Sequence, residues 1–466
     1  MISGADYGHE CAFELLTFNE RLPLIQDHPV TSETAVTLDT FARHIALAIT
    51  LLMSVTVQAN PSTVRGKVID AKSGTPIAGA FITFGETMVQ TDATGSFVAT
   101  GTRPTVGARA YGYDRAEAPV NPPDIPGSSD VELRLMPISP KSLYLSFWGV
   151  ASKPLSQGVL DLIASTEVNS LVVDVKGDRA MIAHRSAVPL AAQIGAQKAI
   201  TMPDMKGTVA AFKAKGIYTI ARIVVFKDEL LAAAKPEWTV KTTTGEIYRD
   251  KENLMWVDAN IRGVWDYNIA VAMEAAAAGF DEIQVDYVRF PDTTGIVFSK
   301  PNTETQRVST IGGFLAEAKK RLYPYNVYIS ADVFGYLCWA KDDLQIGQKL
   351  EVVGQHVDYL APMLYPSGFS EGIPGARNPV AAPYDIIYRS LVAAREKTGF
   401  EPVRFRPWLQ AFRDYGFDKR SFNGPEIRAQ IKASEDFGSN GWMLWNPRNV
   451  YQAAGLKSRN PLAANQ

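Results

Sequence analysis

One stretch of sequence decides how the fold of this chain is interpreted: Phe280-Asp281-Glu282-Ile283-Gln284-Val285-Asp286-Tyr287-Val288-Arg289-Phe290-Pro291. Its apolar residues and its length are typical of a strand buried in a sheet. Gly279 stands directly before it, where the C-cap of a helix is expected, and the amphipathic segment Val264–Ala278 precedes that glycine. A helix followed at once by a buried strand is one unit of an α/β fold.

The same strand–helix alternation occurs eight times between residues 140 and 460. Eight units over about 320 residues predict an α/β fold, a (β/α)8 TIM barrel with extended loops. A doubly wound open sheet is the alternative, but no Gly-x-Gly-x-x-Gly follows the first strand. The expected strands are Leu143–Trp148, Ser170–Asp174, Ile217–Phe226, Glu282–Phe290, Val327–Val333, Val357–Leu364, Arg404–Phe412 and Gly441–Trp445.

Residues 62–136 have a different pattern, in which short apolar runs alternate with turn signals such as Ser73-Gly74. This predicts a small all-β sandwich in front of the barrel. The segments Gly66–Asp70, Gly74–Ala80 and Thr91–Phe97 resemble the carboxypeptidase regulatory-like domain, a transthyretin-like sandwich. The resemblance implies a fold and no chemistry. We therefore expect a folded spacer that catalysis can do without, with carbohydrate binding as the alternative.

Residues 1–59 are interpreted as a leader. Ile45 to Val57 is uncharged and follows Arg43, and Val57-Gln58-Ala59 has the small-x-small pattern that signal peptidase cleaves. The run is shorter than the ~18–20 residues that span a bilayer. We predict export with cleavage after Ala59 and a secreted, periplasmic or envelope location. A buried helix or a short membrane anchor is the alternative.

The composition excludes several classes of function. Lys+Arg 47 against Asp+Glu 49 gives no electrostatic basis for binding nucleic acid. The two cysteines, Cys11 and Cys338, exclude a disulfide scaffold and a cysteine-rich zinc module. Five histidines do not suggest a multi-histidine metal centre. We expect no cofactor and no metal, and the sequence predicts no oligomeric state.

Two aspartates stand at the ends of neighbouring expected strands, Asp286 on the fourth and Asp332 on the fifth. Active sites of TIM barrels lie at the carboxyl ends of the strands, and a charge buried without a partner is costly. Two such carboxyl groups can act on a glycosidic bond, one protonating the leaving oxygen while the other attacks or activates water. We predict Asp286 and Asp332 as the catalytic pair. The alternative is that they only pair with Arg222, Arg289 or a backbone amide.

Other residues at or near the strand ends are predicted to bind substrate. Aromatic rings offer flat apolar faces to sugars, although each ring taken alone is more often part of the core. A nucleophile must be ionised, and a guanidinium favours the charged form of a carboxyl group. We therefore expect Arg222 nearer to Asp286 than to Asp332, with Asp174 orienting the guanidinium. The predicted set is Trp148, Asp174, Arg222, Tyr287, Arg289, Tyr365, Trp408, Gln410 and Trp445.

Several separate motifs stand out in the barrel part of the sequence. They are Leu171–Lys176, Ile220–Asp228, Trp256–Asp258, Phe280–Pro291, Ser330–Gly335, Ala361–Pro366, Arg406–Gln410 and Gly441–Pro447. Together they resemble a bacterial family of glycoside hydrolase TIM barrels, loosely similar to the α-amylase-like barrels. The resemblance covers about residues 141–455 and implies a poly- or oligosaccharide substrate, with Asp286 as nucleophile and Asp332 as acid/base. Asp332 stands where α-amylases carry Glu, which leaves the stereochemistry open.

Two other functions remain as alternatives. A non-catalytic envelope protein could bind glycan with the same aromatic residues and would need no close carboxyl pair. A Mg²⁺-dependent barrel enzyme would use Asp174, Asp286 and Asp332 as ligands, which requires the three carboxyl groups to converge on one point. The distances among these groups separate the hypotheses, whereas the sugar and the linkage are not specified by the sequence.

Overall fold

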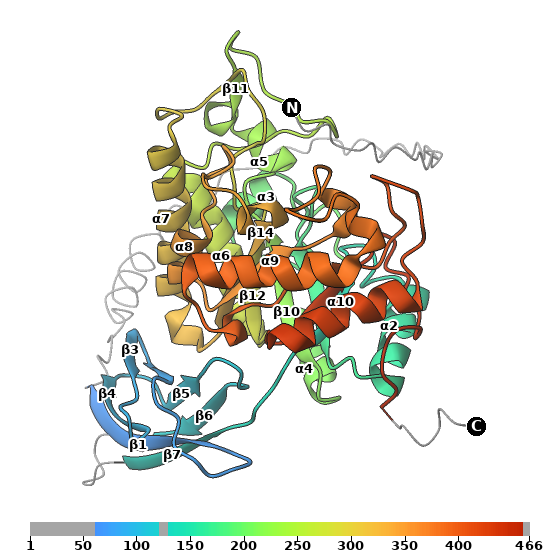
Figure 1. Ribbon diagram of the computed structural model, residues 1–466. Coiled ribbons are helices and arrows are strands. Elements are labelled where there is room, and N and C mark those ends of the chain that lie inside the picture. The colour runs from blue at the N-terminus through green and yellow to red at the C-terminus, as the bar shows by residue number, and fades with distance from the viewer. Residues whose placement is uncertain (1–60, 121–128, 460–466) are drawn as a thin grey trace, which may run out of the picture. The chain divides into compact units, whose positions relative to one another are not determined.

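The structure is a computed structural model that describes residues 61–120 and 129–459 (Figure 1). It contains a closed barrel and, before it in the chain, two small sheets. The predicted leader with its cleavage after Ala59 lies outside the described residues, as does Cys11. No helix in the described part of the chain is long and apolar enough to cross a membrane.

The N-terminal β domain consists of a three-stranded and a four-stranded sheet, in the orders β4-β1-β7 and β3-β2-β5-β6. Both sheets contribute to one core, in which Val68, Ile82 and Leu133 are buried. This agrees with the small all-β domain expected from the turn signals. The likeness to a carboxypeptidase regulatory-like domain stays a prediction. The strands are β1 (Ser62–Asp70), β2 (Phe81–Phe84), β3 (Thr87–Gln90), β4 (Ser96–Gly101), β5 (Thr105–Arg109), β6 (Ala116–Pro119) and β7 (Ser129–Leu135).

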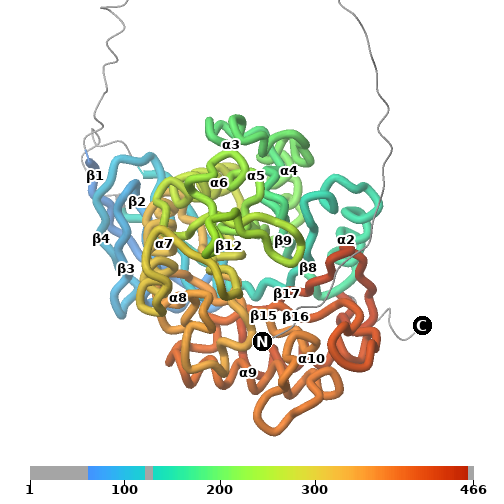
Figure 2. Tube along the Cα trace, turned by 90° about the horizontal axis from the view of Figure 1, so that it is seen from above, coloured from blue at the N-terminus to red at the C-terminus, as the bar shows by residue number. Residues whose placement is uncertain are grey.

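The second part is the predicted barrel of eight parallel strands. The last strand pairs with the first, Trp442 opposite Lys141, so the sheet is closed and the open-sheet alternative is wrong. Figure 2 shows the strands inside a ring of helices. The strands are β8 (Lys141–Leu145), β9 (Ser170–Lys176), β10 (Tyr218–Val224), β12 (Glu282–Asp286), β14 (Tyr328–Phe334), β15 (Tyr359–Met363), β16 (Trp408–Gln410) and β17 (Trp442–Trp445).

The helices begin and end where local sequence signals place them. Asp204 and Asp228 accept hydrogen bonds from the first-turn amides of α4 and α5. Gly279 ends α6 in the left-handed conformation, with φ 104°, as its position before a strand predicted. The helices are α2 (Lys153–Ser165), α3 (Pro189–Gln193), α4 (Met205–Lys213), α5 (Glu229–Ala234), α6 (Arg262–Ala278), α7 (Glu304–Leu322), α8 (Leu350–His356), α9 (Pro383–Thr398) and α10 (Gly424–Phe437).

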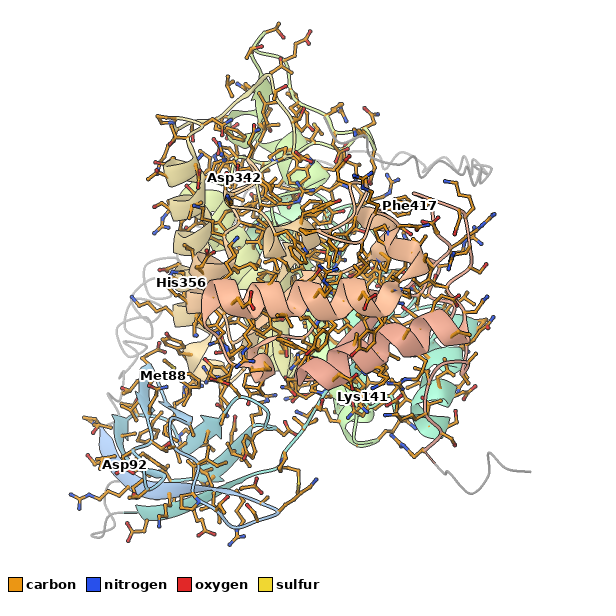
Figure 3. The ribbon with its side chains drawn as sticks, in the orientation of Figure 1. Met88, Asp92, Lys141, Asp342, His356 and Phe417 are labelled. Atoms are coloured by element: carbon orange, nitrogen blue, oxygen red, sulfur yellow. The ribbon has the colours of Figure 1, made fainter. Side chains whose placement is uncertain are left out.

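Long loops lie on the carboxyl side of the barrel strands. Two of them pair through the short strands β11 (Lys241–Thr242) and β13 (Ile296–Val297). Figure 3 shows the side chains of the described residues and labels His356, the last residue of α8. The first barrel strand ends earlier than predicted, at Leu145, because the chain then forms a turn in which Val150 N donates to Ser146 O.

Contacts between the β domain and the barrel lie at the amino ends of the barrel strands. The hydroxyl of Tyr328, which begins β14, lies 2.7 Å from the carbonyl oxygens of Ala110 and Tyr113. Arg115 donates to the carbonyl of Gly279 at 2.9 Å and to Asp281 at 3.2 Å, just before β12. The β domain therefore packs against the barrel at the end opposite to the strand ends that carry the predicted catalytic residues.

Candidate active site

Four of the predicted residues meet at the carboxyl ends of adjacent barrel strands. Asp174 lies on β9, Arg222 on β10, Asp286 at the end of β12 and Asp332 on β14. These strands are neighbours in the barrel, in the order β9-β10-β12-β14. The residues point inward because side chains alternate between the two faces of each strand. The register places Arg222 opposite Asp174, which explains their contact.

Arg222 is the centre of this cluster and is almost completely buried. Its Nε and Nη2 donate to Asp286 Oδ2 at 2.9 and 2.6 Å, and its Nη1 donates to Asp174 Oδ1 at 2.7 Å. Asp332 Oδ2 is 4.0 Å from Nε. Burial lowers the pKa of Arg222, but the neighbouring carboxylates raise it well above its ordinary value. The expected order of distances, Asp286 nearer than Asp332, is confirmed.

Asp332 lies deeper in the barrel than Asp286, with 1% of the residue exposed against 7%. Burial, followed by the charge of Asp286, raises the pKa of Asp332 well above the usual range. The indole Nε1 of Trp408 donates to its Oδ1 at 2.7 Å. The Asp286 carboxyl group lies near enough to contribute to this shift in pKa.

Asp174 is fully occupied by neighbouring donors. Its Oδ2 accepts hydrogen bonds from the Tyr144 hydroxyl at 2.7 Å and the Phe147 amide at 3.1 Å, while its Oδ1 accepts from Arg222. Burial raises the pKa of Asp174 to about 6, although Arg222 acts in the opposite direction. With both oxygens engaged, Asp174 orients the guanidinium as the sequence predicted.

The three predicted carboxyl groups do not converge on an empty point between them. The Arg222 guanidinium lies between Asp174 and Asp286, at hydrogen-bond distance from both. A cation in that position repels a second cation. Among residues 61–120 and 129–459, no group of three or more His, Cys, Asp or Glu side chains is arranged to hold a metal ion. The donor set therefore does not fit the Mg²⁺ alternative.

Asp178 belongs to the cluster and was missed by the sequence analysis. Its Oδ1 lies 2.9 Å from Arg222 Nη2. The predicted second strand stopped at Asp174, whereas β9 continues to Lys176, so Asp178 follows the real strand end by two residues. An Asp placed so soon after a barrel strand was the signal that could have found it, since such residues line the catalytic face.

The predicted aromatic residues divide into buried and exposed ones. Trp445 stacks on Tyr144 with ring centres 4.1 Å apart, and Arg222 lies 5.1 Å from the centre of the Trp445 ring. Trp408 is 1% exposed and packs edge-on against both rings. Trp408 therefore packs against Tyr144 and Trp445 inside the barrel and offers no open face to a sugar.

Three further predicted residues lie around this group. Gln410 is fully buried, and its amide binds Ser367 within the protein, so it too offers no surface to substrate. Tyr365 is half-buried and packs edge-on against Phe412. Trp148 is 58% exposed and lies in the turn after β8, not at a strand end, because that strand stops at Leu145.

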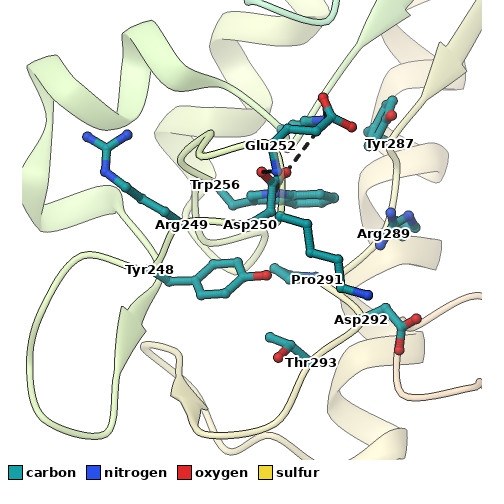
Figure 4. Close-up of a pocket in the computed structure, with 12 residues that line it drawn as sticks. Tyr248, Arg249, Asp250, Glu252, Trp256, Tyr287, Arg289, Pro291, Asp292 and Thr293 are labelled. Atoms are coloured by element: carbon teal, nitrogen blue, oxygen red, sulfur yellow. Dashed lines mark hydrogen bonds and ion pairs between the residues drawn. The ribbon is translucent and has the colours of Figure 1, made fainter. Parts of the chain in front are cut away.

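A cleft opens beside the cluster. Tyr287, which follows Asp286 and turns the chain with φ 49°, lines a cavity of about 380 Å³ together with Tyr248, Trp256 and Arg289 (Figure 4). The Arg289 guanidinium lies 4.9 Å from the centre of the Trp256 ring and 5.4 Å from that of Tyr287.

A second cavity, of about 870 Å³, shares Arg289 with the first and continues the cleft. Phe334, Tyr336 and Trp339 line it, from the end of β14 and the turn that follows. Both cavities are lined by aromatic and polar side chains. Tyr287 and Arg289 were predicted to bind substrate, and Lys227, Trp256 and Phe334 belong to the motifs named above, whereas Tyr248, Tyr336 and Trp339 were not singled out from the sequence.

Comparison with known families identifies the barrel. A family model described as "Putative glycosyl hydrolase domain" matches residues 142–451. This range is more than half of the 466 residues, so the chain belongs to that family. The resemblance to glycoside hydrolases is confirmed at that level, and the closer relationship to α-amylases stays a prediction. No curated protein matches the sequence.

Several solved structures are similar to parts of the chain. A hypothetical protein from Ruminiclostridium thermocellum is 38% identical, with 41% of this chain and 97% of that chain covered and a TM-score of 0.38. The PgaB (BpsB) glycoside hydrolase domain from Bordetella bronchiseptica is 13% identical, with 67% and 95% covered and a TM-score of 0.45. A GH18 chitinase from Pseudoalteromonas aurantia is 12% identical, with 66% and 93% covered and a TM-score of 0.37.

Proposed function

We propose that this member of the glycosyl hydrolase family hydrolyses glycosidic bonds of a poly- or oligosaccharide, with Asp286 as the carboxylate that reacts at the sugar. The observation that carries the proposal is the different surroundings of two neighbouring carboxyl groups. Asp286 receives two hydrogen bonds from the Arg222 guanidinium, whereas burial, followed by the charge of Asp286, raises the pKa of Asp332 well above its usual range. Glycoside hydrolysis needs both a charged and a protonated carboxyl group in one site.

Asp286 is the better placed of the two to meet a substrate. Its side chain keeps 10% exposure and leads directly to Tyr287 in the cleft, while the Asp332 side chain is 1% exposed. Asp332 has its hydrogen-bonding capacity directed at Asp286 and Trp408. In this proposal Asp332 acts through Asp286, by donating a hydrogen bond that positions the Asp286 carboxylate. A second, substrate-facing carboxyl group protonates the leaving oxygen.

The cleft supports a chain-like substrate over a small one. Two adjoining cavities of about 380 and 870 Å³ share Arg289 and carry aromatic rings on their walls. Rings bury the apolar faces of sugars, and the intervening polar side chains can bind hydroxyl groups. Two cavities of these sizes, the first lined by Tyr287 next to Asp286 in the chain, have room for several sugar units.

The test is a screen of the purified chain against polysaccharides, including bacterial cell-wall glycans, with new reducing ends and product masses as the readout. Asp286→Asn should abolish turnover, since an amide cannot act as nucleophile or base. Asp161→Asn, on the exposed face of α2, is the matched control. Glycan binding without any turnover would instead favour the non-catalytic binding function. No binding and no turnover on any glycan would refute the proposal.

We further propose that residues 1–59 direct export, with cleavage after Ala59, so that the barrel of residues 140–460 acts outside the cytoplasm or in the envelope. The apolar run before a small-x-small site supports this proposal. In the same proposal residues 62–136 are a carboxypeptidase regulatory-like spacer. N-terminal sequencing of the mature protein from its native host checks the cleavage site. An intact N-terminus on a protein found in the cytoplasm would refute it.

A further inference from the structure

We propose that Asp178 is the second substrate-facing carboxyl group of this site and serves as the acid/base partner of Asp286. This inference rests on the glycosidase function proposed above and names the residue that function requires. Asp178 follows the end of β9 by two residues and contacts the same Arg222 nitrogen, Nη2, as Asp286. Asp332, which the sequence suggested for this role, is buried, with 1% of its side chain exposed.

Exposure separates Asp178 from the other carboxyl groups of the cluster. Only its Oδ1 contacts Arg222, and no other donor within the described ranges is recorded for its carboxyl group. Both oxygens of Asp174 and of Asp286 accept hydrogen bonds from side chains and backbone amides, and Asp332 accepts one from Trp408. The exposed fractions of the four side chains are 42% for Asp178, 10% for Asp286, 3% for Asp174 and 1% for Asp332.

The distance between Asp178 and Asp286 fits a hydrolase pair. Asp178 Oδ1 is 2.9 Å and Asp286 Oδ2 is 2.6 Å from the same nitrogen, Arg222 Nη2. Two atoms that contact one nitrogen this closely are separated by less than about 6 Å, which includes the ~5–5.5 Å of a retaining pair. The Asp332 side chain is 1% exposed and so offers no comparable approach to a glycosidic bond.

The backbone holds Asp178 in place before substrate arrives. Gly177 N donates to Met181 O at 3.1 Å, and Ala180 N donates to Gly177 O at 2.9 Å. Ala180 takes the left-handed conformation with φ 62°, which an alanine adopts only where its surroundings impose it. A Cβ at Gly177 would lie 3.1 Å from Phe147 Cβ, so the turn is also closely packed. A preorganised carboxyl group costs little ordering on binding.

The reaction balances with these two residues. In the first step Asp178 gives its proton to the glycosidic oxygen while Asp286 attacks the anomeric carbon; the bond to the leaving group breaks and a glycosyl ester of Asp286 forms. In the second step water attacks that carbon and gives its proton to Asp178, and the ester breaks to release the sugar.

The experiment uses leaving groups of different acidity on Asp178→Asn in the full chain. The probes are the 2,4-dinitrophenyl and phenyl glycosides of glucose, galactose and N-acetylglucosamine, in both anomers. Asparagine still accepts a hydrogen bond from Arg222, so a purely structural role would survive the substitution. We expect kcat/KM to fall about 10²- to 10⁴-fold on phenyl glycosides, which need protonation, and at most a few-fold on dinitrophenyl glycosides. Azide should restore the activity of Asp178→Gly and yield a glycosyl azide of retained configuration.

The outcomes separate this inference from the proposed function. Asp286→Asn should lose activity on both leaving groups, and Asp161→Asn should match the wild type. If Asp286→Asn is inactive while Asp178→Asn is unchanged, or falls equally on both leaving groups, Asp178 is not the acid/base and only this inference fails. If the wild type cleaves neither a probe nor a polysaccharide, the proposed function fails, and the role of Asp178 fails with it.

Discussion

Replacing Arg222 by lysine tests the organisation of the carboxyl cluster while it keeps the positive charge. Arg222 makes four hydrogen bonds, two to Asp286 and one each to Asp174 and Asp178. The planar fork reaches three carboxyl groups from one side chain, whereas a lysine ammonium is a single point. Arg222→Lys therefore leaves at least one carboxylate without its cation.

The magnitude follows from which carboxylate loses its partner. Asp174 is 2% exposed and takes only neutral donors from Tyr144 and Phe147 once the guanidinium is gone. Removing one member of a buried ion pair costs about 3–5 kcal/mol. We expect Arg222→Lys to lower the free energy of unfolding by about that amount at pH 7. The misplaced Asp286 should lower kcat by about 10²-fold or more.

The assay combines urea denaturation with the turnover assay on whichever glycan is cleaved. Arg321→Lys is the matched control, because Arg321 pairs with the exposed Asp266 at 2.8 Å on the outside of the barrel. A surface pair of this kind is worth about 0–1 kcal/mol. A stability change under about 1 kcal/mol in Arg222→Lys, with kcat unchanged, would show that the fork geometry is not required.

Three further predictions concern stability. Asp174 has a folded-state pKa of about 6, above its unfolded value, so the folded protein holds the extra proton. The free energy of unfolding contributed by Asp174 therefore falls as pH rises from about 4 to 6. Denaturation of wild type and Asp174→Asn at both pH values should show a stability difference that shifts against the wild type by about 1.4 kcal/mol per pH unit. A pH-independent difference would contradict this prediction. Trp408→Phe removes the indole hydrogen bond to buried Asp332 and should cost about 1–3 kcal/mol in urea denaturation, an effect that Trp148→Phe, at an exposed position, should not reproduce. A chain that begins at Pro140 should keep its turnover at low temperature but unfold at a lower temperature in calorimetry. The reason is that the hydrogen bonds between Tyr328 and Ala110 and between Arg115 and Gly279, which join the two domains, are lost. An unchanged Tm would show that the contacts between the domains contribute nothing.

The sequence by itself determined the barrel and the centre of the candidate site. Eight consecutive strand–helix units commonly fold into one closed structure, the TIM barrel. Its parallel strands bring their carboxyl ends to one face of the barrel. Asp174, Arg222, Asp286 and Asp332 stand near the ends of four consecutive strands, so their convergence followed from local pattern and chain order. These properties depend on residues close together in the chain, which is why they were predictable.

Only the tertiary structure decided which of these residues a substrate can reach. Trp408 and Gln410 have the residue types of a sugar-binding rim but point into the closed barrel. Asp332 is buried in the barrel, where the indole of Trp408 donates to it from another strand. Asp178 became visible only when β9 proved two residues longer than predicted and a turn directed its carboxyl group toward Arg222. Side-chain direction and burial depend on contacts among segments distant in the chain, and local sequence pattern does not contain that information.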